Sequence, residues 1–281
     1  MTVATGREQI PRLAVHGLAM PAIGLGTSGL GNCGETVATA LALGYRLIDT
    51  ARKYGSERGV GEGMRAARVP RDEIFLTTKV SHEHLRAGDF ARSVDESLEA
   101  LGVDFVDLLL VHWPNPEIPL AETVAALAKA KRQGLTRHIG VANFNIALLD
   151  QAIRLSPEPL LTLQAEHHPY LDQDRLLEAC RERGLLFTAH CPLARGRLLD
   201  DPVIKEIGAK KQRSVAQIAL RWLIQQGNII PIPRSSNPRR LGENLDIFGF
   251  ALTPEEMHRI AALERPDGRV ANPAGRAPIW D

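Results

Sequence analysis

The chain has 281 residues, 44% hydrophobic and 24% charged, with a formal net charge of +1. This composition is typical of a soluble globular protein, and the near-neutral charge excludes a bulk electrostatic attraction to nucleic acid or to a membrane surface. The three cysteines, Cys33, Cys180 and Cys191, are irregularly spaced and predict neither a disulfide framework nor a metal site. No signal peptide or transmembrane run is predicted, so we expect a cytoplasmic protein. We also expect a monomer without a metal ion.

Strand-like and helical segments alternate along the chain after an N-terminal hairpin, which we expect within residues 1–21 around His16-Gly17. Eight strands are predicted at 22–27, 45–49, 74–80, 106–112, 136–142, 160–166, 185–190 and 229–233. Helices are predicted at 35–43, 57–68, 89–101, 119–133, 146–155, 173–183, 201–211, 214–226, 238–246 and from Thr253 onward.

The alternation of apolar strands with helices predicts a parallel sheet that is covered by helices. Eight such units in under 300 residues favour a closed (β/α)8 TIM barrel with the N-terminal hairpin and two auxiliary helices; a doubly wound open sheet is the alternative. Neither a linker nor a shift in composition divides the chain. We therefore expect a single domain over 1–281, with the Pro/Gly-rich tail at 265–281 over the mouth of the barrel.

Four residues with proton-handling side chains lie at or just beyond the predicted carboxyl ends of adjacent strands. Asp49, Lys79 and His112 end the second, third and fourth strands, and Tyr54 follows Asp49 by five residues. Because barrel enzymes carry their active sites at the carboxyl ends of the strands, we expect these side chains to meet.

This residue set suits the protonation of an oxygen atom. An ammonium from Lys79 would lower the pKa of Tyr54, Asp49 would keep Lys79 charged, and His112 would orient a carbonyl. The alternative is structural: an Asp49–Lys79 salt bridge at the end of the barrel, with His112 in a packed turn.

Eight short motifs are spread along the chain: GLGT at 24–27, DTARKYGSE at 49–57, TTK at 77–79, HWP at 112–114, GVANF at 140–144, QAEHHP at 164–169, IPRS at 232–235 and RLGEN at 240–244. In this combined set the chain resembles the aldo-keto reductases, from about residue 12 to the end. The tail segments 267–270 and 277–281 look most like those of bacterial 2,5-diketo-D-gluconate reductases.

The resemblance implies roles for these residues in an NADPH-dependent carbonyl reduction. Tyr54 would be the general acid, Lys79 and Asp49 would tune its pKa, and His112 would orient the carbonyl. NADPH would supply the hydride, which no side chain can. The residues implied to hold the cofactor are Gly26, Thr27, Asp49, Asn143, Gln164, His190, Cys191, Leu193, Arg234, Ser235, Arg240, Glu243 and Asn244.

The loop after the last strand has residues suited to a 2′-phosphate. Arg234 and Arg240 offer two guanidiniums, Ser235 offers a hydroxyl, and Pro238 opens a helix whose N-terminus favours an anion. We therefore expect NADP rather than NAD. The alternative is a solvated basic loop.

Several positions depart from the family pattern. His190 stands where an aromatic residue usually stacks on the nicotinamide, and Ser28 and Ser81 replace common aromatics of the substrate pocket. With Tyr54, His112 and Trp113, they would form a pocket that is wide and polar, with Trp113 as its main aromatic wall. Arg269 could meet a substrate carboxylate, although a solvated arginine is the preferred interpretation.

We expect the substrate to be a small polar carbonyl, such as a dicarbonyl or a keto-sugar acid like 2,5-diketo-D-gluconate. Two other functions stay open: a broad aldehyde or methylglyoxal detoxifying reductase, and a redox-sensing regulatory protein that holds NADP. The complete set of Asp49, Tyr54, Lys79 and His112 argues against the regulatory protein.

Overall fold

The computed structural model of the chain describes residues 10–15 and 17–281. An antiparallel pair comes first, formed by β1 (Arg12–Val15) and β2 (Leu18–Pro21), and this confirms the predicted hairpin, although His16 of its turn lies outside the described residues. The strands that follow are β3 (Leu25–Gly26), β4 (Leu47–Asp49), β5 (Phe75–Val80), β6 (Val106–Val111), β7 (Thr136–Ala142), β8 (Leu160–Glu166), β9 (Leu186–His190) and β10 (Ile229–Pro231).

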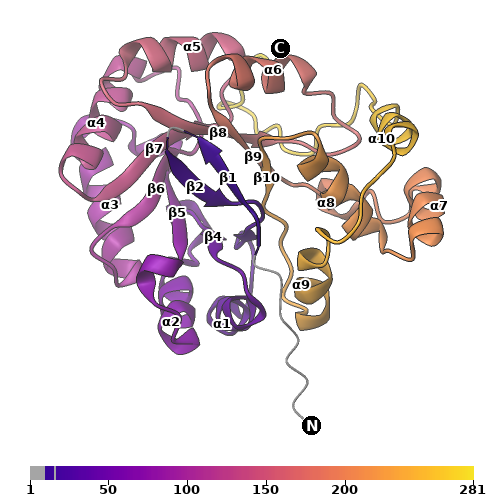
Figure 1. Ribbon diagram of the computed structural model, residues 1–281. Helices are drawn as coiled ribbons and strands as arrows, with labels where there is room; N and C mark the ends of the chain where they lie inside the picture. The colour runs from indigo at the N-terminus through magenta and orange to yellow at the C-terminus, as the bar shows by residue number, and fades with distance from the viewer. Residues whose placement is uncertain (1–9, 16) are drawn as a thin grey trace.

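Helices alternate with these strands and surround the sheet (Figure 1). They are α1 (Cys33–Leu43), α2 (Glu57–Ala67), α3 (Ala87–Leu101), α4 (Leu120–Arg132), α5 (Ile146–Leu155), α6 (Asp174–Glu182), α7 (Pro202–Lys211), α8 (Val215–Gln225), α9 (Pro238–Leu245) and α10 (Pro254–Ala261). No helix among the described residues is long and apolar enough to cross a membrane.

The eight-stranded sheet is parallel and closes on itself. Its strands follow chain order from β3 to β10, and two backbone hydrogen bonds join its ends, from Gly24 N to Pro231 O and from Gly26 N to Pro233 O, both 3.0 Å long. At Gly26, a Cβ atom would lie 2.8 Å from the carbonyl oxygen of Ile232, so this close approach requires glycine. The closure confirms the predicted (β/α)8 barrel and excludes the open sheet.

Strands β3 and β10 are shorter than the predicted 22–27 and 229–233. The reason is local: Pro231 and Pro233 have no backbone N–H to donate, so the ladder between these strands is reduced to alternate bonds. The other element boundaries agree with the predictions to within two or three residues.

Apolar side chains fill the barrel and the layer between strands and helices. On β6, Leu108 and Leu110 belong to the inner cluster, whereas Leu109 and Val111 belong to the outer cluster that packs against the helices. Met20 of β2 joins the inner cluster, so the hairpin closes the amino-terminal end of the barrel. The opposite end, at the carboxyl ends of the strands, is left for polar side chains.

Two helices lie outside the regular β/α alternation, as the sequence predicted. Helix α7 is inserted between β9 and α8, and α10 follows α9; the two lie side by side in Figure 1. Arg259 of α10 and Glu206 of α7 form an ion pair of 2.7 Å. Both helices have side-chain N-caps, Asp201 for α7 and Thr253 for α10, and each has proline at its first turn.

The C-terminal segment after α10 has no regular structure and is held at the carboxyl ends of the strands. Glu166, the last residue of β8, accepts hydrogen bonds from the backbone N–H groups of Val270 and Ala271 at 2.6 and 2.7 Å. Farther on, Asp281 accepts a hydrogen bond of 2.9 Å from the N–H group of Ile146, at the start of α5. These contacts bring the tail to the same end of the barrel as Asp49, Lys79 and His112.

Candidate active site

A buried ion pair lies at the centre of the site. Lys79 Nζ on β5 is 2.5 Å from Asp49 Oδ1 on β4, and their side chains are 0% and 3% exposed. Lys79 also donates to the carbonyl oxygen of Thr50 at 2.9 Å, and Asp49 Oδ2 accepts a hydrogen bond of 2.8 Å from Gln164 Nε2. Because the remaining polar atoms of the pair are largely satisfied, the barrel can keep both charges inside.

Tyr54 reaches the same mouth through a short turn after β4. The 3-10 turn Arg52–Tyr54 ends at Gly55, whose φ of 67° is left-handed and suits glycine. The hydroxyl oxygen of Tyr54 is 3.5 Å from His112 Nε2, and Lys79 Nζ lies 5.2 Å from the centre of the Tyr54 ring. The four residues predicted as catalytic are therefore brought together.

The electrostatics of Tyr54 and Lys79 differ from the expectation. We expected Lys79 to lower the pKa of Tyr54, but the net shift of that pKa is upward. Burial disfavours the phenolate and raises the pKa of Tyr54, and Asp49 and Cys191 add to the increase. Burial also lowers the pKa of Lys79, although the charge of Asp49 opposes that change. Tyr54 thus keeps its proton at neutral pH.

His112 is neutral in this environment. Burial lowers its pKa well below the ordinary value, and the charge of Lys79 adds to the effect. A neutral imidazole has one N–H donor and one acceptor nitrogen. The hydroxyl of Tyr54 and the Nε2 atom of His112 can therefore both approach one carbonyl oxygen.

Two amides and an imidazole lie beside these residues at the ends of β7, β8 and β9. Asn143 donates to the carbonyl oxygen of His112 at 2.8 Å, and its Oδ1 atom lies 2.8 Å from His190 Nε2. Asn143 has a left-handed φ of 61°. The other amide, Gln164, donates a hydrogen bond to the carboxylate of Asp49. Partial burial lowers the pKa of His190 to about 4, so this imidazole is neutral at pH 7.

Four further residues implied to line the cofactor lie around this group. Thr27 is buried and donates to the backbone carbonyl of Asp49 at 3.1 Å, next to the barrel closure at Gly26. Cys191 and Leu193 follow β9 and are half-buried, and Cys191 has a left-handed φ of 51°. Burial raises the pKa of the Cys191 thiol, which is consistent with a packed thiol.

The basic loop after β10 is at the surface. Arg234 Nη1 donates to the carbonyl oxygens of Ser28 and Gly29 at 3.0 and 3.4 Å, so it ties this loop to the one after β3. Ser235 accepts a hydrogen bond from the N–H group of Asn237, which caps α9. Arg240 is exposed, and no carboxylate of the described residues forms an ion pair with it.

The two residues implied to bind adenine have other partners. Glu243 pairs with Arg239 at 2.8 Å, and Asn244 is 4% exposed and hydrogen-bonded to Tyr45. Their role toward adenine stays a prediction.

The predicted substrate pocket gains an aromatic wall that the sequence analysis missed. Ser28 is exposed, while Ser81 is buried and donates to Glu83 at 2.8 Å. Trp113 was expected to be the main aromatic wall, and Trp280 of the tail lies edge-on to it, with ring centres 6.2 Å apart. The aromatic residue in the tail motif at 277–281 was the available signal for this contact.

Arg269 is also placed differently from the preferred expectation. Its guanidinium lies 3.8 Å from the centre of the Trp280 ring, and the residue is half-buried. Arg269 is therefore part of the tail's packing rather than a solvated side chain.

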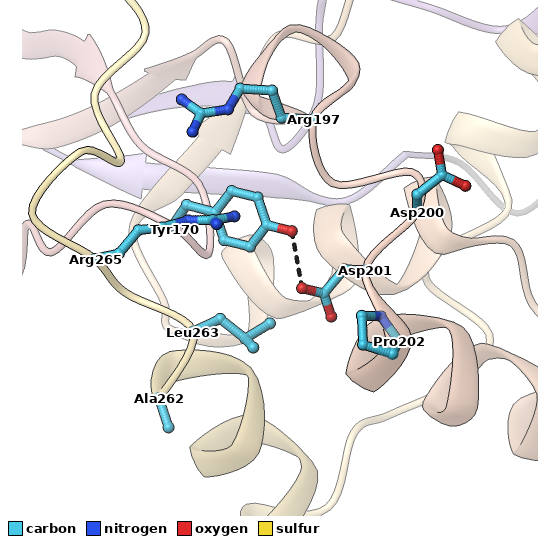
Figure 2. A pocket seen from close by; sticks show the side chains of 8 residues that line it. All are labelled: Tyr170, Arg197, Asp200, Asp201, Pro202, Ala262, Leu263 and Arg265. Atoms are coloured by element: carbon cyan, nitrogen blue, oxygen red, sulfur yellow. Dashed lines mark hydrogen bonds between the residues drawn. The ribbon is translucent and has the colours of Figure 1, made fainter.

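Two cavities adjoin the tail. Figure 2 shows the larger cavity, about 620 Å³, which lies between the loops after β8 and β9 and the end of α10. In it, the hydroxyl of Tyr170 donates a hydrogen bond of 2.8 Å to Asp201, and the guanidinium of Arg265 covers the Tyr170 ring. The smaller, about 360 Å³, lies under residues 275–278 and is lined by Val111 and Phe144. None of the predicted site residues lines either cavity.

Residues 10–15 and 17–281 contain no cluster of His, Cys, Asp or Glu suited to a metal ion.

Comparisons with known proteins agree with the motif set. The model of the aldo/keto reductase family matches residues 22–265. The methylglyoxal reductase DkgB of Escherichia coli O157:H7 is 40% identical over 269 residues, which cover 94% of this chain and 100% of the relative. A crystal structure described as that of a candidate 2,5-diketo-D-gluconic acid reductase B is 43% identical, with a TM-score of 0.95 and coverage of 97% and 98%. A Bombyx mori aldo-keto reductase in complex with NADP is 33% identical, with a TM-score of 0.85 and coverage of 92% and 94%.

Proposed function

The chain belongs to the aldo/keto reductase family, and from this membership we propose that it reduces a small polar aldehyde or ketone to an alcohol with NADPH. The observation that carries the proposal is the meeting of Tyr54 and His112 above the buried Lys79–Asp49 pair. Two hydrogen-bonding groups converge there on a position that a carbonyl oxygen can take.

Tyr54 is the proposed general acid. Its phenol stays protonated at neutral pH, and it transfers that proton to the carbonyl oxygen as negative charge develops there. His112 is neutral and hydrogen-bonds the same oxygen, which orients the carbonyl. The Lys79 ammonium lies near the Tyr54 ring and stabilises the phenolate that the transfer leaves behind, while Asp49 holds Lys79 in place.

The residues around the mouth fit a nicotinamide cofactor. Asn143 and Gln164 are amides that can both donate and accept, as a carboxamide requires, and neutral His190 offers a flat face beside them. Thr27, Cys191 and Leu193 would complete the wall. The hydride comes from the bound dihydronicotinamide.

NADPH is proposed over NADH because of the basic loop. Arg240, in the first turn of α9, is exposed and has no ion-pair partner among the described residues, and Arg234 and Ser235 lie on the loop that precedes α9. A 2′-phosphate favours such guanidiniums, whereas a ribose hydroxyl needs none. The NADP-bound Bombyx mori relative supports this choice.

A small polar dicarbonyl or keto-sugar acid is the proposed substrate class. Ser28 and Ser81 keep two walls polar, and two of the relatives described above are named for methylglyoxal and 2,5-diketo-D-gluconic acid. A methylglyoxal reductase is the second candidate, because methylglyoxal is itself a small dicarbonyl and a relative that is 40% identical is named for it. Both activities would belong to a cytoplasmic monomer.

A carbonyl panel tests the proposal. The purified protein should oxidise NADPH with 2,5-diketo-D-gluconate or methylglyoxal, with a higher kcat/KM than with benzaldehyde. A strong preference for benzaldehyde would contradict the polar pocket. Tight NADPH binding without turnover of any carbonyl would favour a regulatory NADP-holding protein instead.

A further inference from the structure

A buried carboxylate that the proposed mechanism does not use lies next to the site. Glu57 is the first residue of α2 and comes shortly after Tyr54 in the chain, and its side chain is 2% exposed. Burial raises the pKa of Glu57, although Thr78 and Arg52 oppose that change. A buried carboxylate costs free energy unless it is hydrogen-bonded or paired, so its contacts show what it can do.

The first contact of Glu57 is with the strand that carries Lys79. Glu57 Oε1 accepts a hydrogen bond of 2.6 Å from the hydroxyl of Thr78 on β5. The sheet register pairs Thr78 with Leu109, which belongs to the outer cluster, so Thr78 faces the helices. Successive side chains of a strand point to opposite faces, so Lys79 faces the inside of the barrel. Glu57 therefore holds β5 from the helix side, at the residue before Lys79.

The second contact of Glu57 is with the turn that carries Tyr54. Arg52 begins the 3-10 turn Arg52–Tyr54, and its Nη1 atom lies 3.7 Å from Glu57 Oε2. Oε2 accepts no hydrogen bond from the described residues, so the guanidinium charge of Arg52 compensates it. Arg52 also forms an ion pair of 2.7 Å with Glu96 of α3, in which the side chains are 37% and 47% exposed. Of these two carboxylates beside Arg52, Glu57 is the buried one.

The position of Glu57 is itself fixed, because the start of α2 is anchored to two other strand ends. The hydroxyl oxygen of Ser56 lies 3.1 Å from Thr50 Oγ1 and 3.3 Å from Thr27 Oγ1, and all three residues are buried. Thr27 and Thr50 directly follow β3 and β4. Glu57 is therefore a fixed point from which one carboxylate reaches both β5 and the turn of Tyr54.

This link affects the separation of the proton donor and the cation. Lys79 Nζ lies 5.2 Å from the centre of the Tyr54 ring, and the stabilisation of a phenolate by this ammonium falls as the two charges move apart. Burial lowers the pKa of Lys79, and the charges of Asp49 and Glu57 oppose that change. A misplacement of about 1 Å in an active site can cost roughly 100-fold in rate, so a clamp at this point acts on the chemical step.

We propose that Glu57 is a positioning residue for the proton transfer: through Thr78 and Arg52 it sets the place of Tyr54 relative to Lys79. The inference rests on the proposed carbonyl reductase function. It adds to that function a residue that acts from the helix side of the sheet.

Removal of the acceptor or of the donor tests this role. Glu57→Met keeps a side chain of similar length without the oxygen atoms, and Thr78→Val removes the hydroxyl. Each should lower the single-turnover rate of methylglyoxal reduction by about tenfold, while the KM for methylglyoxal and the affinity for NADPH stay within about twofold. The double variant should be no slower than the slower single variant, because both changes remove the same interaction.

Two further variants separate positioning from a loss of folded protein. Glu57→Gln keeps an oxygen that can accept from Thr78 and should react within about threefold of the wild-type rate. Glu96→Gln is the matched control, because Glu96 pairs with the same Arg52 in a solvent-exposed position, and it should change the rate by less than about twofold. The solvent deuterium isotope effect on the rate should be larger in Glu57→Met than in the wild type, because a misaligned proton transfer then limits the reaction. Unfolded molecules would lower only the amplitude.

A probe of Tyr54 that needs no substrate separates this inference from the proposed function. The chain has three tyrosines, so a protein labelled with 3-fluorotyrosine should give three ¹⁹F signals, and Tyr54→Phe identifies the one from Tyr54. That signal should move in Glu57→Met and in Thr78→Val and keep its place in Glu96→Gln.

The failures of the two proposals can be told apart. A wild type that reduces no carbonyl but shows these shifts of the Tyr54 signal would refute the proposed function and keep the positioning role. A wild type that reduces carbonyls, together with a Glu57→Met variant of equal rate and an unmoved Tyr54 signal, would refute the positioning role. A loss in Glu57→Met that lies entirely in the KM for methylglyoxal would also refute it, because Glu57 would then act on binding.

Discussion

The surroundings of Tyr54 keep its phenol protonated, and a protonated phenol suits the proposed role of general acid. Burial and the charge of Asp49 both raise the pKa of Tyr54, so the phenol carries its proton before a carbonyl compound binds. The ammonium of Lys79 is the positive charge that can compensate the phenolate after transfer. The sequence predicted which residues meet, but not this direction of the pKa shift, because the balance between burial and charge depends on three-dimensional packing.

Arg240 and Arg239 are neighbours with different surroundings, and this allows a controlled test of cofactor choice. Arg240→Ala should raise the KM for NADPH by roughly tenfold or more and leave the KM for NADH nearly unchanged, because only NADPH has the 2′-phosphate. Arg239 already pairs with Glu243, so Arg239→Ala should have a much smaller effect on NADPH. Steady-state kinetics with both cofactors measures this, and equal effects on NADPH and NADH would place the phosphate elsewhere.

Among the elements, those built from local patterns were predicted well and the tail was not. Helix α3 presents Phe90, Val94 and Leu98 to the core and ends at Gly102 with a φ of 67°, and both features are visible in the sequence. The tail is positioned instead by Glu166, about a hundred residues away in the chain. A contact between residues so far apart in the chain leaves no periodic pattern in the sequence. The contacts of Trp280 and Arg276 were therefore missed, and Arg269 was interpreted as solvated.

Glu166→Gln tests how the tail is held. The carboxylate accepts three hydrogen bonds, from Val270, Ala271 and His168, and an amide would turn a donor toward at least one of them. Each lost bond to the charged group is worth about 1.5–3 kcal/mol. We expect faster trypsin cleavage after Arg269 and Arg276 and a raised KM for the carbonyl.

The affinity for NADPH should be unchanged in Glu166→Gln, measured by fluorescence titration. Exposed Glu264 provides the control substitution, Glu264→Gln, which should behave as the wild type. A variant with normal tail protection and a normal KM would show that Glu166 does not hold the tail.

For the molecule as a whole, the barrel follows from the alternation of eight apolar strands with helices. Its closure depends on bonds between residues near 24–26 and 231–233, which a sequence pattern does not show. The barrel brings together side chains from several strand ends, and some of the histidine side chains among them are buried. His167 and His190 both have pKa values lowered to about 4, with burial as the main cause.

This burial predicts acid sensitivity. Between about pH 6.5 and pH 4, the unfolded chain protonates these histidines while the folded protein does not, so stability falls as the pH falls. Each such histidine contributes a slope of up to about 1.4 kcal/mol per pH unit. Urea unfolding at pH 7, 6 and 5 should show this decline, and His167→Gln should reduce it. Exposed His84 offers the control, His84→Gln, and an unchanged slope in His167→Gln would contradict the prediction.

Replacement of Tyr54 by phenylalanine tests the proposed chemistry most directly. The ring and its packing against Lys79 and His112 remain, and only the proton donor is lost. The measurement is single-turnover oxidation of NADPH by methylglyoxal, with NADPH affinity determined on the same samples. We predict unchanged NADPH affinity and a rate lower by about 10²–10⁴-fold, the usual contribution of general acid catalysis. A rate within a few-fold of the wild type would show that Tyr54 is not the proton donor.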